Sequence, residues 1–297
     1  MEAKEIVNFL RELAHDAGTI MMSRRGNPLQ VFRKSDSSLV TEVDLAISRM
    51  VVTRVTTFAP HWGLMTEETC GGQCPEQEVG LIVDELDGTN GYANGLGGFT
   101  FQSAFHIGGR VVCSVIYDPL ANRLVYAIKG QGVWLEEGSA CRRIRQSTSR
   151  SWQTLRFAHH RRYMTDTIAR MYARLGTSPQ HIVPTGGIGS KIIDFVLGKV
   201  DVIVALNRNI QPWDWAPGKL ILEELGYACS HLTGTPLQLF SKTHELEFGY
   251  LVCPQEHWSR FLRELSWITE KVVPNHLLLE IFREKLLPVG IRSNLSV

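Results

Sequence analysis

The sequence has little of three features that would point to a particular class of protein: excess charge, cysteine and long apolar runs. Its 31 basic and 30 acidic residues leave a net charge of +1, so a bulk attraction to nucleic acid or anionic lipid is not expected. No stretch approaches the ~20 continuous apolar residues of a membrane span. The first stretch, MEAKEIVNFL, contains acids and does not resemble a secretory signal. We therefore expect a cytoplasmic protein with no nucleic-acid and no membrane partner.

The six cysteines are scattered through the chain, which is typical of reduced thiols rather than of a disulfide framework. Cys70 and Cys74 are the exception, in TCGGQC. We interpret them as two loop thiols, with a redox clip or half of a zinc site as the alternative. No His or Cys pair at ligand spacing completes a tetrahedral set, so zinc is not expected.

The apolar pattern divides the chain into two halves, residues 1–150 and 151–297, which we expect to pack tightly into one body. In the first half, helical spacing covers residues 3–23 and 42–58, and short runs typical of an antiparallel meander follow. Those strand-like runs are 80–84, 99–107, 110–118, 122–130 and 132–138.

In the second half, short strand-like runs alternate with helical stretches, which suggests an α/β unit. The strand-like runs are 156–160 and 201–206, and the helical stretches are 166–175, 190–198 and 216–225. Helical apolar spacing returns in the tail beyond residue 255, which we expect to pack on this body or on a partner subunit.

Three acids lie close together in IVDELDGTNGYANG: Asp84, Glu85 and Asp87. Two carboxylates a few ångströms apart repel each other by roughly 1 kcal/mol in water and by more in a drier site. A fold accommodates them by solvation, by a shared proton or by a bound cation. The D-G and N-G pairs are also strong turn signals, so a solvated acidic turn is the alternative to a cation site.

Further acids lie elsewhere in the chain. Glu67 and Glu68 stand in GLMTEETC, Asp44 lies in the first turn of the second helix, and Asp214 lies where another helix begins. Asp44 and Asp214 are equally typical of helix caps. Clustered carboxylates suit a hard cation such as Mg²⁺, and helix N-termini, including the glycine-rich TGGIGSK, suit an anion. In the absence of a G-x-x-x-x-G-K-[ST] loop, the combination favours phosphate ester chemistry.

Four segments together resemble the inositol monophosphatase superfamily, which contains Mg²⁺-dependent, Li⁺-sensitive phosphomonoesterases: VDELDGTNGY, TEE, SSLVTEVD and WDWAPGKLILEELGY. The resemblance extends from the first helix to about residue 255. It implies the sugar phosphatase sandwich of αβαβα layers, an α+β or α/β fold. It further implies a homodimer that hydrolyses a small sugar, polyol or inositol monophosphate with two or three Mg²⁺ ions.

The resemblance also implies a role for each residue that matches the family motifs. Glu67, Asp84 and the backbone carbonyl of Leu86 would hold the first metal. Asp84, Asp87 and Asp214 would hold the second. Divalent ions would then neutralise the close pair of acids, and an activated water would attack phosphorus in line.

The remaining catalytic roles follow from the same resemblance. Asp44 and Glu67 would lie near a weaker third metal and the nucleophilic water. The N–H groups of Gly88 and Thr89 would bind the phosphate, and the Thr89 hydroxyl would orient the water.

The sequence departs from the family pattern at three positions. Glu85 stands where the family usually has proline, and it either adds a negative group beside the metals or points to solvent. Asn207 replaces an acid that binds inositol hydroxyls, so inositol 1-phosphate is not expected to be the best substrate. Lys191 replaces a small residue and either lines the pocket or is a solvated helix lysine. Lys191, Asn207 and Gln211 are the expected substrate-binding residues.

Two rival functions stay open. A 3′-phosphoadenosine nucleotide phosphatase usually shows Asp-Gly-Thr-Lys-Glu-Phe, whereas this chain has Asp-Gly-Thr-Asn-Gly-Tyr. The other rival is a regulatory or binding protein on a degenerate phosphatase scaffold. Glu85 would then indicate a loss of catalytic activity, but the carboxylates that match the metal ligands of the family are all intact.

Overall fold

The structure is a computed structural model of the 297-residue chain. It describes residues 2–34, 38–70, 78–145, 150–160, 165–206, 210–240 and 249–269. Asn207, Cys74 and the tail beyond Thr269 lie outside the described residues, as does the side chain of Cys70.

The helices follow the predicted apolar spacing closely in the N-terminal half. Their bounds are Ala3–Arg24 (α1), Glu42–Phe58 (α2), Glu67–Cys70 (α3), Thr89–Ala93 (α4), Asp166–Leu175 (α5), Ile188–Val196 (α6), Pro212–Glu224 (α7) and Trp258–Thr269 (α8). Three short 3₁₀ turns cover Trp152–Thr154, Pro179–His181 and Gln255–His257.

The predictions for α6 and α7 placed their starts too late. α6 begins at Ile188 and α7 at Pro212, whereas the apolar pattern gave residues 190 and 216. Pro212 is the first residue of α7, a position at which proline favours the start of a helix. The first turn of α6 is stabilised by hydrogen bonds from its backbone N–H groups to Asp87. Apolar periodicity detects neither signal.

A seven-stranded sheet contains the predicted meander. Its order is β3 (Gly63–Thr66), β4 (Val79–Asp87), β5 (Thr100–Ile107), β6 (Arg110–Asp118), β7 (Arg123–Ile128), β8 (Gly132–Glu137) and β9 (Ala140–Ile144). Strands β4 to β9 pair antiparallel with their sequence neighbours, and β3 lies parallel to β4. The sequence analysis found neither β3 nor β9, and it also missed the hairpin of β1 (Val31–Arg33) and β2 (Leu39–Thr41).

A second sheet lies in the C-terminal half. Its order is β11 (Ile182–Thr185), β10 (Phe157–His160), β12 (Val202–Ala205), β14 (Tyr250–Pro254) and β13 (Tyr227–His231). β10 is parallel to β11 and β12, and β14 is antiparallel to β12 and β13.

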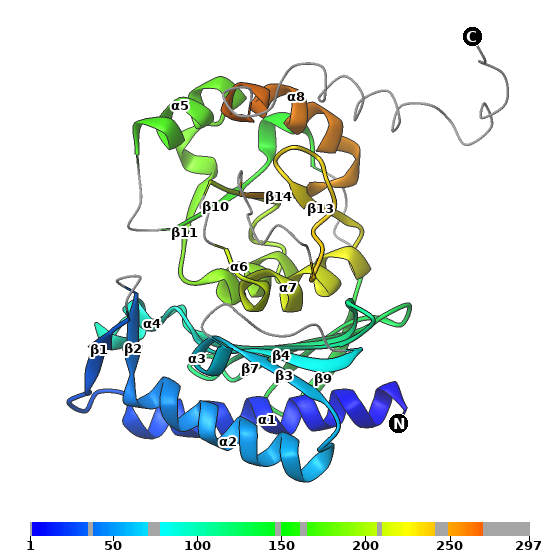
Figure 1. The fold of residues 1–297 in the computed structure, drawn as a ribbon. Helices are drawn as coiled ribbons and strands as arrows, with labels where there is room; N and C mark the ends of the chain where they lie inside the picture. The colour runs from blue at the N-terminus through cyan, green and yellow to red at the C-terminus, as the bar shows by residue number, and fades with distance from the viewer. Residues whose placement is uncertain are drawn as a thin grey trace, which may run out of the picture.

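Helices and sheets stack in alternating layers (Figure 1). α1 and α2 cover one face of the seven-stranded sheet, and α6 and α7 lie between the two sheets. α5 and α8 cover the outer face of the five-stranded sheet. Each interface has its own apolar cluster, as expected when a sheet face must be buried against another layer. The predicted αβαβα sandwich is confirmed.

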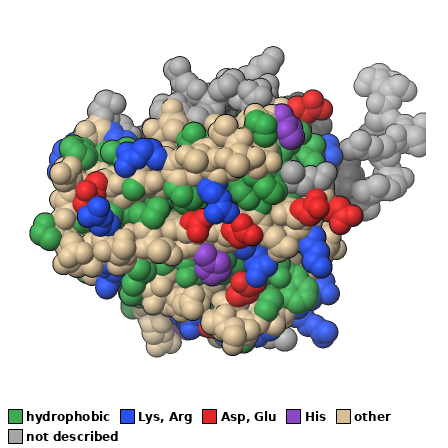
Figure 2. Space-filling model, turned by 90° about the horizontal axis from the view of Figure 1, so that it is seen from below, with side chains coloured by type: hydrophobic (Ala, Val, Ile, Leu, Met, Phe, Trp, Pro, Cys, Tyr) green, Lys and Arg blue, Asp and Glu red, His purple; other side chains and the backbone are tan. Residues whose placement is uncertain are grey.

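The outer face of α1 and α2 carries charges of both signs between separate apolar side chains (Figure 2). Arg54 of α2, for example, bonds to Glu12 of α1 at 2.7 Å. Within the described part of the chain, no helix combines the length and the apolar character that crossing a membrane requires.

Candidate active site

The acidic motif lies at the C-terminal end of β4, where the strand is irregular. A β-bulge separates Asp84, which lies opposite Gln102 of β5, from Asp87, which lies opposite Thr100. In a regular strand, residues three apart point to opposite faces, but the extra residue of a bulge brings both to one face. Gln102 Nε2 accordingly donates to Asp84 at 3.2 Å, and Thr100 Oγ1 donates to Asp87 at 3.1 Å.

Asp87 also holds the start of α6. The backbone N–H groups of Ile188 and Gly189 donate to its two carboxylate oxygens at 3.0 and 2.7 Å. Gly187 is required at the preceding position, because a Cβ there would collide with the Asp87 carboxylate. Burial raises the pKa of Asp87, and the two amides oppose that shift by stabilising the charged form. The glycine-rich TGGIGSK segment is therefore an ordered helix start bound to the acidic motif.

Asp44 and Asp214 each cap a helix with one carboxylate oxygen. Asp44 Oδ2 accepts the N–H of Thr41 at 2.8 Å, and Asp214 Oδ2 accepts the N–H of Gln211 at 2.7 Å. The capping interpretation is thus correct, but each carboxylate has a second oxygen. Asp44 Oδ1 accepts the Thr89 hydroxyl at 3.1 Å, which ties it to the acidic motif. Asp44 can therefore cap α2 and belong to the candidate site at the same time.

Thr89 and Gly88 form the turn after β4. Gly88 has φ of 84°, a left-handed conformation that favours glycine, and a Cβ there would lie 2.9 Å from the Gly98 carbonyl oxygen. The Thr89 hydroxyl also lies 2.8 Å from the carbonyl oxygen of Leu86. The turn therefore places the Thr89 hydroxyl beside Asp44, and the binding of phosphate by the Gly88 and Thr89 N–H groups stays a prediction.

Four carboxylates influence one another across β4, α3 and α7. Burial raises the pKa of Asp84 well above its usual range, and Glu67, Asp87 and Asp214 raise it further. Burial likewise raises the pKa of Asp214 to about 7, with Glu67 and Asp87 adding to the shift. In the residues that the structure describes, however, no three acidic, His or Cys side chains converge closely enough to form a ready-made metal cluster. The four acids lie in one region of the protein, but their side chains do not converge on a single point.

Two of the three expected substrate-binding residues lie beside these acids. Lys191 is half-buried on α6 and interacts electrostatically with Asp87 and Asp214. Gln211 is half-buried at the N-cap of α7. Asn207, the third, lies outside the described residues, so its place in the site stays a prediction.

Comparison with known proteins identifies the family. The sequence profile of the inositol monophosphatase family matches residues 2–268. The chain belongs to the inositol monophosphatase family. Nus factor SuhB of Salmonella typhimurium is 28% identical over 227 residues, covering 74% of this chain and 83% of the relative. The fructose-1,6-bisphosphatase/inositol-1-monophosphatase of Thermotoga maritima is 27% identical over 246 residues, covering 82% and 92%.

A solved structure supports the fold of this inositol monophosphatase family member. An IMPase of Thermotoga maritima superposes with a TM-score of 0.77 and covers 91% of this chain and all of that one. Its sequence identity is 24%, so this likeness shows the shared fold alone.

The donor groups of this family member suit a hard divalent cation. Carboxylate and carbonyl oxygens are the ligands that Mg²⁺ prefers. Glu67, Asp84, Asp87 and Asp214 supply the carboxylates, and mutual repulsion between them is what a cation would relieve. The residues therefore fit Mg²⁺, although their assignment as ligands stays a prediction.

Lys34 is a site residue that the sequence analysis missed. Its ammonium group lies 2.8 Å from a carboxylate oxygen of Glu67 and 2.8 Å from one of Glu68. Burial lowers the pKa of Lys34, but the two acids outweigh burial and raise it overall. No spacing signal links residue 34 to residues 67 and 68, because the contact joins the end of β1 to α3, two segments that are distant in the chain.

Glu85 does not point to solvent, contrary to one of the two expectations. It is 1% exposed, and neither carboxylate oxygen makes a hydrogen bond of normal geometry with the described residues. Burial raises its pKa to about 7, and the nearby hydroxyls of Thr66 and Ser48 lower it only in part. Those two hydroxyls lie on β3 and α2, so Glu85 faces the helical layer beneath the sheet. The direction of the Glu85 side chain could not be predicted from the sequence, because the bulge in β4 interrupts the regular alternation of residues between the two faces of the strand.

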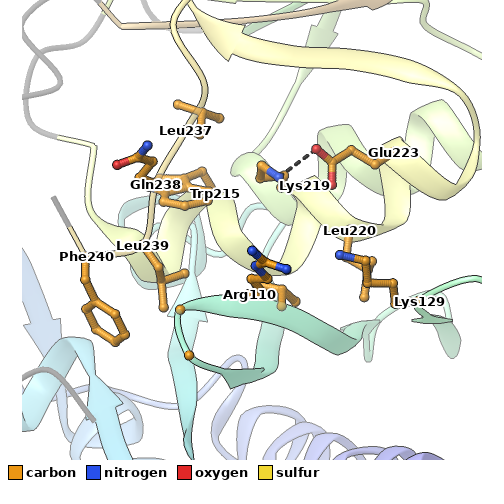
Figure 3. Close-up of a pocket in the computed structure, with 13 residues that line it drawn as sticks. Arg110, Lys129, Trp215, Lys219, Leu220, Glu223, Leu237, Gln238, Leu239 and Phe240 are labelled. Carbon is orange, nitrogen blue, oxygen red and sulfur yellow. Dashed lines mark hydrogen bonds and ion pairs between the residues drawn. The ribbon is translucent and has the colours of Figure 1, made fainter. Parts of the chain in front are cut away.

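A separate cavity of about 350 Å³ borders α7 on the side of the β5–β6 turn (Figure 3). Arg110, Lys129 and Lys219 line it together with Glu223, which pairs with Lys219 at 2.6 Å. None of the acids of the candidate site lines this cavity.

Proposed function

We propose that this protein is a Mg²⁺-dependent phosphomonoesterase that releases phosphate from a small sugar, polyol or inositol monophosphate. The observation that carries the proposal is the group of four interacting carboxylates, Glu67, Asp84, Asp87 and Asp214, beside the turn at Gly88. Membership of the inositol monophosphatase family supports the same class of reaction.

The side chains divide into those that would hold cations and those that would act on substrate. Glu67, Asp84 and the Leu86 carbonyl would hold one Mg²⁺, and Asp84, Asp87 and Asp214 a second. Bound Mg²⁺ supplies positive charge for the phosphate oxygens and lowers the pKa of an attacking water.

Asp44 and Thr89 would handle the proton of that water. The Thr89 hydroxyl donates to Asp44, so its oxygen lone pairs are available to accept a hydrogen bond from the water. The backbone N–H groups of Gly88 and Thr89 would bind the phosphate oxygens, where negative charge grows during the reaction.

Polar side chains would select the leaving group. Lys191, Asn207 and Gln211 offer donors and partial acceptors, which suit a hydroxyl-rich compact substrate. Trp213 and Trp215 flank Asp214, but both are buried and present no open faces to sandwich a purine. We therefore place a 3′-phosphoadenosine nucleotide phosphatase second, and we do not expect inositol 1-phosphate to be the best substrate.

A phosphate-release screen tests the proposal. Sugar phosphates, inositol phosphates and adenosine 3′,5′-bisphosphate would be compared in Mg²⁺ and in excess EDTA. We expect release from a sugar or polyol monophosphate in Mg²⁺ only, with Li⁺ as an inhibitor. Full activity in EDTA, or a preference for the nucleotide, would contradict the corresponding part of the proposal.

A regulatory or binding role is the candidate from outside the enzymes, because several relatives carry the name Nus factor SuhB. Absence of phosphate release from every compound in the screen, in a folded protein, would favour it.

We also propose a homodimer, which light scattering would detect. A shortened chain for that measurement should end at Thr269 rather than near residue 255. Phe261 of α8 is fully buried in the outer apolar cluster, so removing α8 would open that cluster. A monomer at micromolar concentration in both lengths would exclude the dimer.

A further inference from the structure

The cavity of about 350 Å³ beside α7 collects basic side chains from three separate elements. Arg110 is the first residue of β6, Lys129 lies in the turn between β7 and β8, and Lys219 lies on α7. Glu223 is the one acid among the described residues that line the cavity, and it pairs with Lys219 at 2.6 Å. That ion pair leaves the charges of Arg110 and Lys129.

No described acid neutralises these two cations. Within the described part of the chain, no carboxylate oxygen lies within 4.0 Å of a side-chain nitrogen of Arg110 or Lys129, in contrast to Lys219. Both residues are exposed, so their charges are not removed by burial. Charges of one sign that line a hollow concentrate the electrostatic potential there and attract a ligand of the opposite sign.

The backbone fixes the elements that carry the three cations relative to one another. Glu224 of α7 accepts the N–H groups of Gly130 and Gly132, each at 2.8 Å, and so holds the β7–β8 turn against the helix. The N–H of Lys129 donates to the carbonyl oxygen of Val112 on β6 at 3.0 Å. The turn is thus tied to both neighbouring elements, which lowers the ordering cost of binding a ligand between them.

The rest of the cavity is apolar. Leu237, Leu239, Phe240 and Trp215 line it. The β5–β6 turn closes against Phe240, because a Cβ at Gly109 would lie 3.2 Å from the phenyl ring. In Figure 3 the side chains of Leu239 and Phe240 lie to one side of Arg110, and Lys129 lies to the other. This combination suits a ligand with one charged group and one apolar group.

We propose that this cavity binds a small phosphate monoester that carries an apolar group, with Arg110 and Lys129 on the phosphate and with Leu239 and Phe240 on the apolar group. A phosphate monoester carries a charge of about −1.5 to −2 at pH 7, which matches the two unpaired cations, whereas one carboxylate would neutralise only one of them. The arginine fork also suits two phosphate oxygens at once. No acid of the candidate active site lines this cavity, so the inference is independent of the proposed function.

Phenylphosphonate is a suitable probe, because it carries the two groups and its C–P bond is not a phosphate ester. Binding would be measured by isothermal titration calorimetry in excess EDTA, where the carboxylates of the candidate active site hold no cation and repel an anion. Arg110→Gln and Lys129→Met should each weaken binding about tenfold or more. Inorganic phosphate and benzoate should bind the wild type about tenfold or more weakly than phenylphosphonate.

Glu223→Gln should change the affinity in the opposite direction. It removes the acid that lines the cavity and releases Lys219, so phenylphosphonate should bind about twofold to fivefold more tightly. Lys4→Met and Arg263→Gln are matched controls on exposed residues of α1 and α8, and both should bind as the wild type does. Circular dichroism would establish that each variant is folded, and the exposed positions of Arg110 and Lys129 favour this.

Absence of saturable binding of phenylphosphonate up to about 10 mM would overturn the inference. Equal affinities for the wild type, Arg110→Gln and Lys129→Met would also overturn it, as would inorganic phosphate that binds as tightly as phenylphosphonate. The phosphate-release screen decides the proposed function separately, because the binding measurement involves neither Mg²⁺ nor turnover.

Discussion

The Thr89 hydroxyl lies 3.1 Å from a carboxylate oxygen of Asp44, although 45 residues separate the two in the chain. The same hydroxyl lies 2.8 Å from the Leu86 carbonyl oxygen. It has a single proton, so it can donate fully to only one of these acceptors at a time. The contact joins the first turn of α2 to the turn after β4, and it places a proton acceptor next to the proposed attacking water.

Thr89→Val should remove this relay while keeping the shape of the side chain. We expect kcat to fall about 10²- to 10⁴-fold, the usual contribution of a positioned proton-transfer group. Thermal stability should fall modestly, because the buried Asp44 loses the Thr89 donor but keeps the N–H of Thr41. Steady-state phosphate release and a melting curve would measure both effects. Thr53→Val, on the exposed side of α2, is the control, and equal activities for the two variants would argue against a role for Thr89.

Asp87→Asn should cost both activity and stability. An amide nitrogen cannot accept the N–H groups of Ile188 and Gly189, so at least one of these donors loses its partner. A buried donor left unpaired costs about 1–3 kcal/mol. Urea denaturation would measure the loss of stability, and phosphate release the loss of turnover.

Asp118→Asn is a control for the removal of a carboxylate charge without the loss of a hydrogen bond. Asp118 also accepts two backbone N–H groups, from Leu120 and Ala121 at 3.0 and 3.1 Å, but both meet the same oxygen, Oδ1, in a turn outside the acidic motif. Asparagine keeps that oxygen, so Asp118→Asn should retain both stability and activity. If Asp87→Asn retains normal turnover, Asp87 does not belong to the catalytic site.

The parts of the site that the sequence revealed are those in which local pattern and chemistry coincide. Asp84 and Asp87 end an apolar strand, and Asp44 and Asp214 stand where helices begin, so each was visible as a carboxylate at a defined element. The layered fold was implied by the family resemblance, and the order of strands and helices read from the apolar pattern agreed with it.

The parts that stayed hidden depend on contacts between distant segments. Lys34 reaches Glu67 only because the residue that follows β1 comes close to α3 in the folded chain, and such short strands give no periodic signal. The direction of Glu85 depends on a bulge that changes which face each residue of β4 occupies. The parallel pairing of β3 with β4 likewise joins segments that are separate in sequence. Periodicity describes one segment at a time and cannot report these relations.

Mg²⁺ should stabilise the protein more at high pH than at low pH. Burial raises the pKa of Asp44 to about 6 and that of Asp214 to about 7. A raised pKa in the folded state means that the unfolded state binds fewer protons. The stability contributed by these groups is therefore present below about pH 4, their unfolded pKa, and is lost as the pH rises through 6 and 7. Above pH 7 both acids are charged and available to a cation, which offsets their repulsion.

Thermal melting from pH 5.5 to 8, with MgCl₂ or with NaCl at equal ionic strength, would measure this linkage. The increase in Tm caused by Mg²⁺ should grow with pH, because protons compete for the same oxygens at low pH. An increase of the same size at every pH would show that Mg²⁺ acts elsewhere on the protein.

Glu85→Gln should stabilise the protein, and the gain should depend on pH. Burial raises the pKa of Glu85 to about 7 from an ordinary value of 4.5, so folding favours the protonated acid. Its contribution to stability is present below pH 4.5 and is lost as the pH rises through 7. At pH 8 the buried carboxylate is charged and has no hydrogen bond of normal geometry among the described residues, whereas a neutral amide of the same shape avoids that charge.

We expect the Glu85→Gln variant to gain about 1–3 kcal/mol in its free energy of unfolding at pH 8 and less at pH 5. Urea denaturation at the two pH values would measure it, with Glu78→Gln, an exposed acid beside the start of β4, as the control. A gain of equal size at both pH values, or none at pH 8, would mean that Glu85 does not carry a destabilising buried charge.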